Sequence, residues 1–215
     1  MERRTALKNL GLSFGALTLT PSIMSMLQSC QSTGTDWTPS FFSPESAKTI
    51  EQLTELIIPS TPDIPGAKDL KLIRFIDSYI ATTADSQEQT FITSALDLLV
   101  GRCLSTAGKG SVDDLSPQDW DEQLTYFLRA TEENKSLRRD AFTAYRKGIE
   151  RGEELSTPVE GTCHVLLLNL RNLTVKAFKG HETIAKEHMV YQPVPGQFRG
   201  CVDLQEATQG KDWAL

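Results

Sequence analysis

Histidine and cysteine are scarce in this 215-residue sequence, with three and four copies. A c-type haem requires two cysteines, with two residues between them, directly before a histidine. Cys163-His164 supplies only one of these cysteines, because Glu160 holds the other position. The sequence therefore excludes a covalent c-type haem. His164 lies in an apolar stretch, where we expect a buried core histidine in preference to an axial haem ligand.

The remaining histidines do not form a metal site by themselves. His181 and His188 are seven residues apart, which corresponds to about 10 Å along a helix. One ion cannot be bound by both from a straight helix. A site completed by a partner, with Glu182 and Glu187 nearby, is the alternative to ordinary surface or capping roles. We expect no metal on this chain.

Cofactor-binding and catalytic motifs are also missing. There is no glycine-rich dinucleotide motif after a strand, no phosphate-binding loop and no nucleophile elbow. The acidic pairs at 113–114 and 153–154 fall in predicted loops or helix ends, where acidic residues are common. These absences predict a chain without its own cofactor and without a catalytic residue.

The sequence lacks an excess of positive charge, because its formal net charge is −6. The segment before Cys30 carries +2, so the remainder carries −8. Nucleic acids and anionic lipid surfaces attract basic patches. An acidic chain of this kind is not expected to bind nucleic acid.

Alternating strand patterns longer than four residues are absent before Met189, whereas apolar residues recur at spacings of three and four. Ser116 followed by Pro117 is a strong helix start. We predict an all-α fold, a single irregular array of about six helices with a loop-rich tail from Tyr191. The helical segments expected are 44–58, 70–83, 86–107, a helix from 116, 137–155, 159–178 and a short one within 180–189.

Side-chain directions follow from the same periodicity. In the segment 137–155, we expect Phe142, Tyr145 and Ile149 to face the core. Its charged residues, Arg138 among them, are expected to form a solvated face. The segment 159–178 is the most apolar after Cys30, which predicts a central helix.

The first 29 residues have the order of an export signal. Arg3 and Arg4 precede an uncharged, modestly apolar stretch, and Cys30 follows Leu-Gln-Ser. Paired arginines in this position resemble a twin-arginine signal, and the Leu-x-Ser-Cys sequence resembles a lipobox whose cysteine is acylated. We expect residues 1–29 to be a signal peptide. A plain signal or a membrane-spanning anchor is the alternative.

Acylation of Cys30 would leave an odd number of cysteines, Cys103, Cys163 and Cys201, so at most one internal disulfide is possible. Three pairings are open. Cys103 and Cys163 lie in apolar helical patterns and are expected to behave as small buried hydrophobes.

Residues 30–44 are rich in Ser, Thr, Gly and Pro, which predicts a flexible tether after the lipidated cysteine. The aromatic residues Trp37, Phe41 and Phe42 within it are expected to dock on the domain itself. The helical domain is then expected to span 45–215.

Two segments carry a resemblance to a known family. Residues 53–67 read LTELIIPSTPDIPGA and are followed by Phe75-Ile76-Asp77, and residues 191–201 read YQPVPGQFRGC. Together they resemble the gluconate 2-dehydrogenase subunit 3 family over about residues 45–205. The resemblance implies a small subunit that works with a large FAD-containing flavoprotein of the glucose-methanol-choline type. A cytochrome c subunit with haem c is a possible further member of such complexes.

This resemblance, together with the signal, predicts the role of the chain. The twin-arginine route exports folded proteins, so the small subunit would bind its folded, flavin-loaded partner, escort it and anchor it. The protein is then exported and lipid-anchored on the periplasmic side of the cell envelope. The alternative is an envelope lipoprotein that acts as a binding module without an enzyme partner.

The irregular proline- and glycine-rich segments are the candidates for partner contact, because restricted loops lose less entropy on association. Rigid turns within the fold are the alternative interpretation. The candidate residues are Pro59, Pro62, Pro65, Gly66, Gln192, Pro193, Pro195, Gly196, Gln197 and Phe198.

Overall fold

The computed structural model describes residues 37–192, 194, 196–197 and 201–214. Arg3, Arg4 and Cys30 therefore lie outside the described residues. A compact unit begins at Pro39 and contains all the helices named below.

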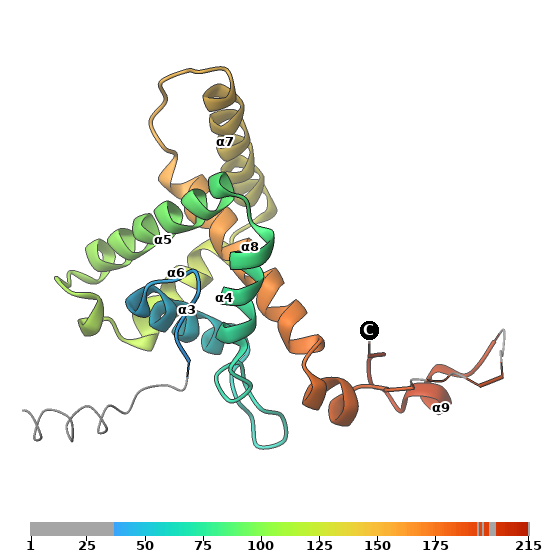
Figure 1. Ribbon diagram of the computed structural model, residues 1–215. Helices are drawn as coiled ribbons and strands as arrows, with labels where there is room; N and C mark the ends of the chain where they lie inside the picture. Colours follow the sequence, from blue (N-terminus) through green and yellow to red (C-terminus); the bar gives the residue numbers. More distant parts are fainter. Residues whose placement is uncertain (1–36, 193, 195, 198–200, 215) are drawn as a thin grey trace, which may run out of the picture. The chain divides into compact units, whose positions relative to one another are not determined.

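The described part of this unit is all-helical, as predicted, and six of its helices are longer than one or two turns (Figure 1). An isolated bridge between Val190 and Trp213 is the only β pairing among the described residues. The long helices are α3 (Pro44–Ile57), α4 (Leu72–Thr83), α5 (Ser86–Ala107), α6 (Pro117–Leu128), α7 (Glu132–Glu150) and α8 (Val159–Lys179). The short elements are η1 (Val112–Asp114), η2 (Ile184–His188) and α9 (Leu204–Thr208).

Local sequence explains where several helices begin. The hydroxyl of Ser116 accepts the N–H of Asp119, whose carboxylate accepts the N–H of Ser116 in return, forming a capping box at the start of α6. The ammonium group of Lys109 also contacts Asp119, at 2.6 Å. Hydrogen bonds from Lys109 and then Ser116 lower the pKa of Asp119 to about 2. The Ser116 start predicted from the sequence is confirmed.

The central position of α8 is confirmed by its contacts, because α3, α4, α5, α6 and α7 all pack against it. Its buried residues include Cys163, Leu167, Leu170 and Thr174. An apolar helix with neighbours on several sides is stabilised by burial on each of them, since a fully buried leucine side chain contributes roughly 1.5–3 kcal/mol. Among the described residues, no helix combines the length and apolar content that crossing a bilayer requires.

The prediction for α7 was wrong in its bounds and in one inward residue. The helix starts at Glu132, five residues before the predicted start, because the Thr131 hydroxyl caps it by accepting the N–H of Asn134. Its polar first turn carries no apolar periodicity that could reveal the start. Ile149 is 48% exposed instead of facing the core, and the helix ends at Glu150.

The short helix expected within 180–189 is present as η2, and it is of the π type. It is a five-residue π-helical turn in which the N–H of Met189 donates to the carbonyl of Ile184 over 3.1 Å. Only Ile184 in this turn is buried.

The segment before α3 is held by a buried carboxylate on α4. The backbone N–H groups of Ser40, Phe41 and Phe42 donate to Asp77 over 2.6, 3.0 and 2.9 Å. Phe42 is buried and its ring meets that of Phe41 edge to face, so these aromatic residues do dock on the domain. Residues 39–43 thus belong to the same compact unit as the helices.

The three described cysteines are free thiols. Cys103 and Cys163 are buried, as predicted, and burial raises the pKa of each to about 11. Cys201 is exposed.

Helix contact at the start of α8 depends on Gly161. A Cβ atom at this position would lie 2.7 Å from the carbonyl oxygen of Arg138 and 3.2 Å from Cβ of Phe142, both on α7. Gly161→Ala is expected to reduce the free energy of unfolding by about 1–3 kcal/mol through overpacking. The measurement is urea-induced unfolding followed by circular dichroism.

Gly101→Ala is the matched control, because nothing lies within 4 Å of a Cβ at this position of α5. It is expected to stabilise by about 0.5–1 kcal/mol, the helix-propensity difference between the two residues. Equal effects of the two substitutions would contradict the proposed contact.

Candidate partner-contact site

The loop between α3 and α4 is closed by its own hydrogen bonds. The hydroxyl of Ser60 donates to the carboxylate of Asp69, and the N–H of Gly66 donates to both groups, over 3.2 and 3.1 Å. The N–H of Thr61 donates to the carbonyl of Ile64 over 2.9 Å. The bond from Ser60, followed by that from Gly66, lowers the pKa of Asp69.

Gly66 is required by this closure. A Cβ atom there would lie against the backbone nitrogen of Ser60, 2.6 Å from its Oγ and 2.9 Å from the carbonyl carbon of Pro59. Of the predicted contact residues in the loop, Gly66 is buried and Pro65 is half-buried, whereas Pro59 and Pro62 are exposed. Gly66 is thus part of the fold, and only the outer prolines are available on the surface.

The C-terminal tail returns to the end of α8 and to η2. The N–H of Val190 donates to the carbonyl of Asp212 over 2.8 Å, and the N–H of Ala214 donates to that of Val190 over 3.0 Å. An ion pair of 2.8 Å joins Lys179 at the end of α8 to Asp212. This arrangement ties the residues after α9 to the last turn of α8.

The predicted contact residues of the tail are exposed where they are described. Gln192, Gly196 and Gln197 lie on the surface, and Val194 between them is 78% exposed. The other candidates, Pro193, Pro195 and Phe198, lie outside the described residues.

The residues after the loop and the residues after α9 both attach to the C-terminal part of α8, although by different contacts. Ala67 and Leu72, which follow the loop, form a buried cluster with Ala177 of α8. The tail uses the ion pair of Lys179. No spacing in the sequence indicates this common attachment.

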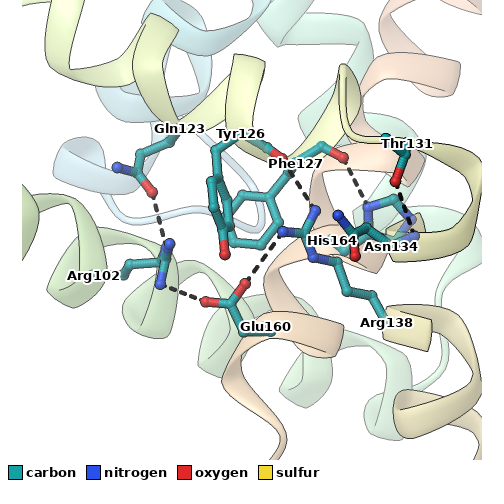
Figure 2. A network of polar contacts seen from close by, with 9 residues as sticks. All are labelled: Arg102, Gln123, Tyr126, Phe127, Thr131, Asn134, Arg138, Glu160 and His164. Atoms are coloured by element: carbon teal, nitrogen blue, oxygen red, sulfur yellow. Dashed lines mark hydrogen bonds and ion pairs between the residues drawn. The ribbon is translucent and has the colours of Figure 1, made fainter. Parts of the chain in front are cut away.

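A polar cluster at the other end of α8 was missed by the sequence analysis. Glu160 contacts Arg102 of α5 at 2.5 Å and Arg138 of α7 at 3.5 Å (Figure 2). The guanidinium carbons of Arg102 and Arg138 lie 4.5 and 4.4 Å from the ring centroid of Tyr126 on α6. The cluster therefore joins four helices through one carboxylate, two guanidinium groups and one ring.

Further hydrogen bonds fix the two arginines. Arg138 donates to the carbonyl of Tyr126 over 3.1 Å, and Arg102 donates to the amide oxygen of Gln123 over 3.1 Å. The side chain of Arg138 is only 10% exposed, so its predicted place on a solvated face was wrong. Planar guanidinium groups can stack on a ring and bind a carboxylate at once, which explains the burial.

His164 is a core residue, as predicted. It lies one helical turn after Glu160, and its Nδ1–H donates to the carbonyl of Phe127 over 3.2 Å (Figure 2). Burial, more than any neighbouring charge, lowers the pKa of His164. Its Nε2 is buried without a hydrogen-bond partner among the described residues. A neutral imidazole is therefore the form that the folded protein favours.

The described residues contain no group of three or more His, Cys, Asp or Glu side chains that could hold a metal ion. Their polar clusters connect helices to one another. The protein is therefore a helical one in which the outer loops and helix faces are the surfaces that can contact other molecules.

The model of the family described as Gluconate 2-dehydrogenase subunit 3 matches residues 44–196, and this chain belongs to that family. The match confirms the resemblance found in the sequence. Membership implies that the chain is a subunit of that dehydrogenase complex. Comparison with curated proteins and with solved structures gave no match.

Removal of the Glu160 charge is expected to destabilise the fold. In Glu160→Gln, two neighbouring guanidinium groups lose their shared carboxylate, and we expect a loss of about 1–3 kcal/mol in the free energy of unfolding. Glu150→Gln is the matched control, because its ion pair with Arg146 is exposed and 4.0 Å long. The control is expected to lose at most about 0.5 kcal/mol. Similar losses in the two variants would contradict a special role for Glu160.

His164 predicts how stability depends on pH. Its folded pKa lies below the ordinary 6.5, so the unfolded chain binds a proton more readily. The contribution of His164 to the free energy of unfolding is complete above pH 6.5. It is lost as the pH falls from 6.5 through the pKa of His164 in the folded protein. We expect the free energy of unfolding to decrease as the pH falls below about 6.5, with a smaller decrease in His164→Gln. Denaturant titrations at each pH measure this, and equal slopes would argue against it.

Proposed function

We propose that this chain is a non-catalytic accessory subunit that binds, escorts and anchors the large flavoprotein subunit of an exported dehydrogenase acting on CH–OH groups of sugars or alcohols. The observation that carries the proposal is the family match over residues 44–196. FAD would belong to the partner, which we expect to be of the glucose-methanol-choline type. A cytochrome c with haem c would be a further member of the complex.

The residues of this chain support a binding role over a catalytic one. The buried carboxylate of Asp77 accepts three backbone N–H groups, and the half-buried side chain of Glu160 pairs with two arginines. Burial keeps the thiols of Cys103 and Cys163 protonated by raising their pKa to about 11. These groups are committed to the fold and are poorly placed for acid–base or nucleophilic work.

The escort role follows from the sequence of residues 1–30. The twin-arginine-like pair Arg3-Arg4 would direct a folded complex across the membrane, and acylated Cys30 would hold it on the periplasmic side of the envelope. A flavoprotein that folds around FAD before export needs such a route, and the small subunit supplies it in trans.

Purification of the full chain from its native membrane tests the partnership. We expect a large flavoprotein to co-purify in stoichiometric amount, detected by mass spectrometry and by the flavin absorbance of the complex. Recovery of the chain without any flavoprotein would favour the alternative, an envelope lipoprotein without an enzyme partner.

Substitution of the arginine pair tests the escort role. Arg3→Lys together with Arg4→Lys preserves charge but removes the pair that the export receptor reads, so both this chain and its flavoprotein are expected to remain in the cytoplasm. Immunoblots of cytoplasmic and envelope fractions measure the distribution. Normal export of the flavoprotein would show that it does not depend on this chain. Cys30→Ala is the companion variant, expected to be exported but released from the membrane.

A further inference from the structure

The exposed side of α4 carries a row of aromatic and basic residues. Phe75 and Tyr79 are four residues apart, a spacing that places them along one side of α4, and Lys71 is exposed directly before the first residue of the helix. Phe75 is 45% exposed and stacks on Tyr79 with ring centroids 5.7 Å apart. The ammonium nitrogen of Lys176, from α8, lies 4.7 Å from the centroid of the Tyr79 ring. These four residues are the aromatic-basic row.

A cavity of about 350 Å³ adjoins this row. Tyr79 and Lys176 belong to both, and the cavity continues between α4, α5 and α8 along mostly apolar side chains such as Ile80, Phe91 and Leu170. Its volume is in the range of pockets that bury a small ligand or a large side chain, roughly 300–1,000 Å³. The aromatic-basic row and the cavity thus form one continuous surface, because Tyr79 and Lys176 belong to both.

The charge of this surface is opposite to that of the whole chain, which carries −6. Asp77 is the only acidic residue of α4, and it is buried against backbone N–H groups. α8 has no acidic residue after Glu160, and among the described residues Glu88 of α5 is the one acidic residue that lines the cavity. Lys71 and Lys176 form no ion pair with a described carboxylate, so their charges are available to another molecule.

We propose that the aromatic-basic row and its cavity are the docking surface for the large subunit of the dehydrogenase, an inference that rests on the proposed function. The partner is a protein surface that inserts an apolar side chain into the cavity and places carboxylates against Lys71 and Lys176. A central aromatic anchor in a pocket with a charged rim is the usual arrangement of an energetic hot spot. Stacked Phe75 and Tyr79 are pre-organised for this contact, which lowers its entropic cost.

Charge and shape favour such a partner over other occupants. A second copy of this chain would bring the same lysines against one another. An anionic bilayer would be repelled by the rest of this acidic chain, and it offers no side chain to fill the cavity. A protein with an apolar patch and an acidic rim matches both the hollow and the charge.

The test uses the full chain co-expressed with the flavoprotein that it captures. Phe75→Ser removes the exposed ring, and Lys176→Glu reverses the charge beside the cavity. Each is expected to weaken capture at least about tenfold, as hot-spot residues do. Leu137→Ser and Lys147→Glu are the matched controls, because these residues are exposed on α7. The controls are expected to change affinity less than about twofold.

Thermal melting of each variant alone separates binding from folding. Phe75 and Lys176 are exposed, so both variants are expected to melt as the wild type does. A photo-crosslinking amino acid at position 75 gives an independent readout, and we expect a covalent adduct with the flavoprotein from position 75 and none from position 137.

The outcomes distinguish this inference from the proposed function. Wild-type capture with undiminished binding by both variants and no adduct from position 75 would overturn the docking surface and leave the proposed function standing. Failure of the wild type to capture any flavoprotein would overturn both. A dimer of the purified chain that Phe75→Ser abolishes would assign the surface to a second copy. Binding to vesicles of phosphatidylglycerol that Lys176→Glu abolishes, with capture unchanged, would assign it to the membrane.

Discussion

The structure depends on the burial of α8, because five other long helices pack against this one element. A helix in that position can carry few charges, and α8 carries its one carboxylate, Glu160, in the first turn. Arg102 and Arg138 meet that carboxylate from two sides. The next residue, Gly161, removes the side chain that would keep α7 away. Charge neutralisation and close backbone approach therefore coincide at the point where α7 and α5 are joined to α8.

Local sequence patterns predicted most of the helices. The wrong predictions concern features that have no local pattern in the sequence. Ser116 and Pro117 predicted the start of α6, because a cap is a property of adjacent residues. The start of α7 was missed, since its first turn is polar and only the hydroxyl of Thr131 marks it. Arg138 was misplaced for another reason. Its partners Tyr126 and Glu160 come from other helices, and a charge pattern on one helix cannot reveal them.

In the candidate site, too, local features were predicted from the sequence and contacts between distant segments were not. The prolines and glycines of residues 59–66 correctly indicated an irregular loop, but Gly66 and Ser60 are satisfied inside it. The aromatic-basic row was not predicted, because helical spacing alone does not tell an exposed Phe75 from a buried one. Its position becomes clear only when Lys176 of α8 is seen against Tyr79. Contacts between helices that are distant in sequence determine which face remains outside.

One helix connects the two tasks that we propose for this chain, anchoring and partner binding. Asp77 lies on the buried side of α4 and holds the backbone of residues 40–42, from which the chain continues back to Cys30 and the arginine pair. Phe75 and Tyr79 stack on one another on the same helix, and Tyr79 lines the cavity. A carboxylate that accepts several backbone N–H groups is costly to displace, since each group would lose a charge-assisted bond. A force on residues 40–42 is thus passed directly to the helix on which we place the partner.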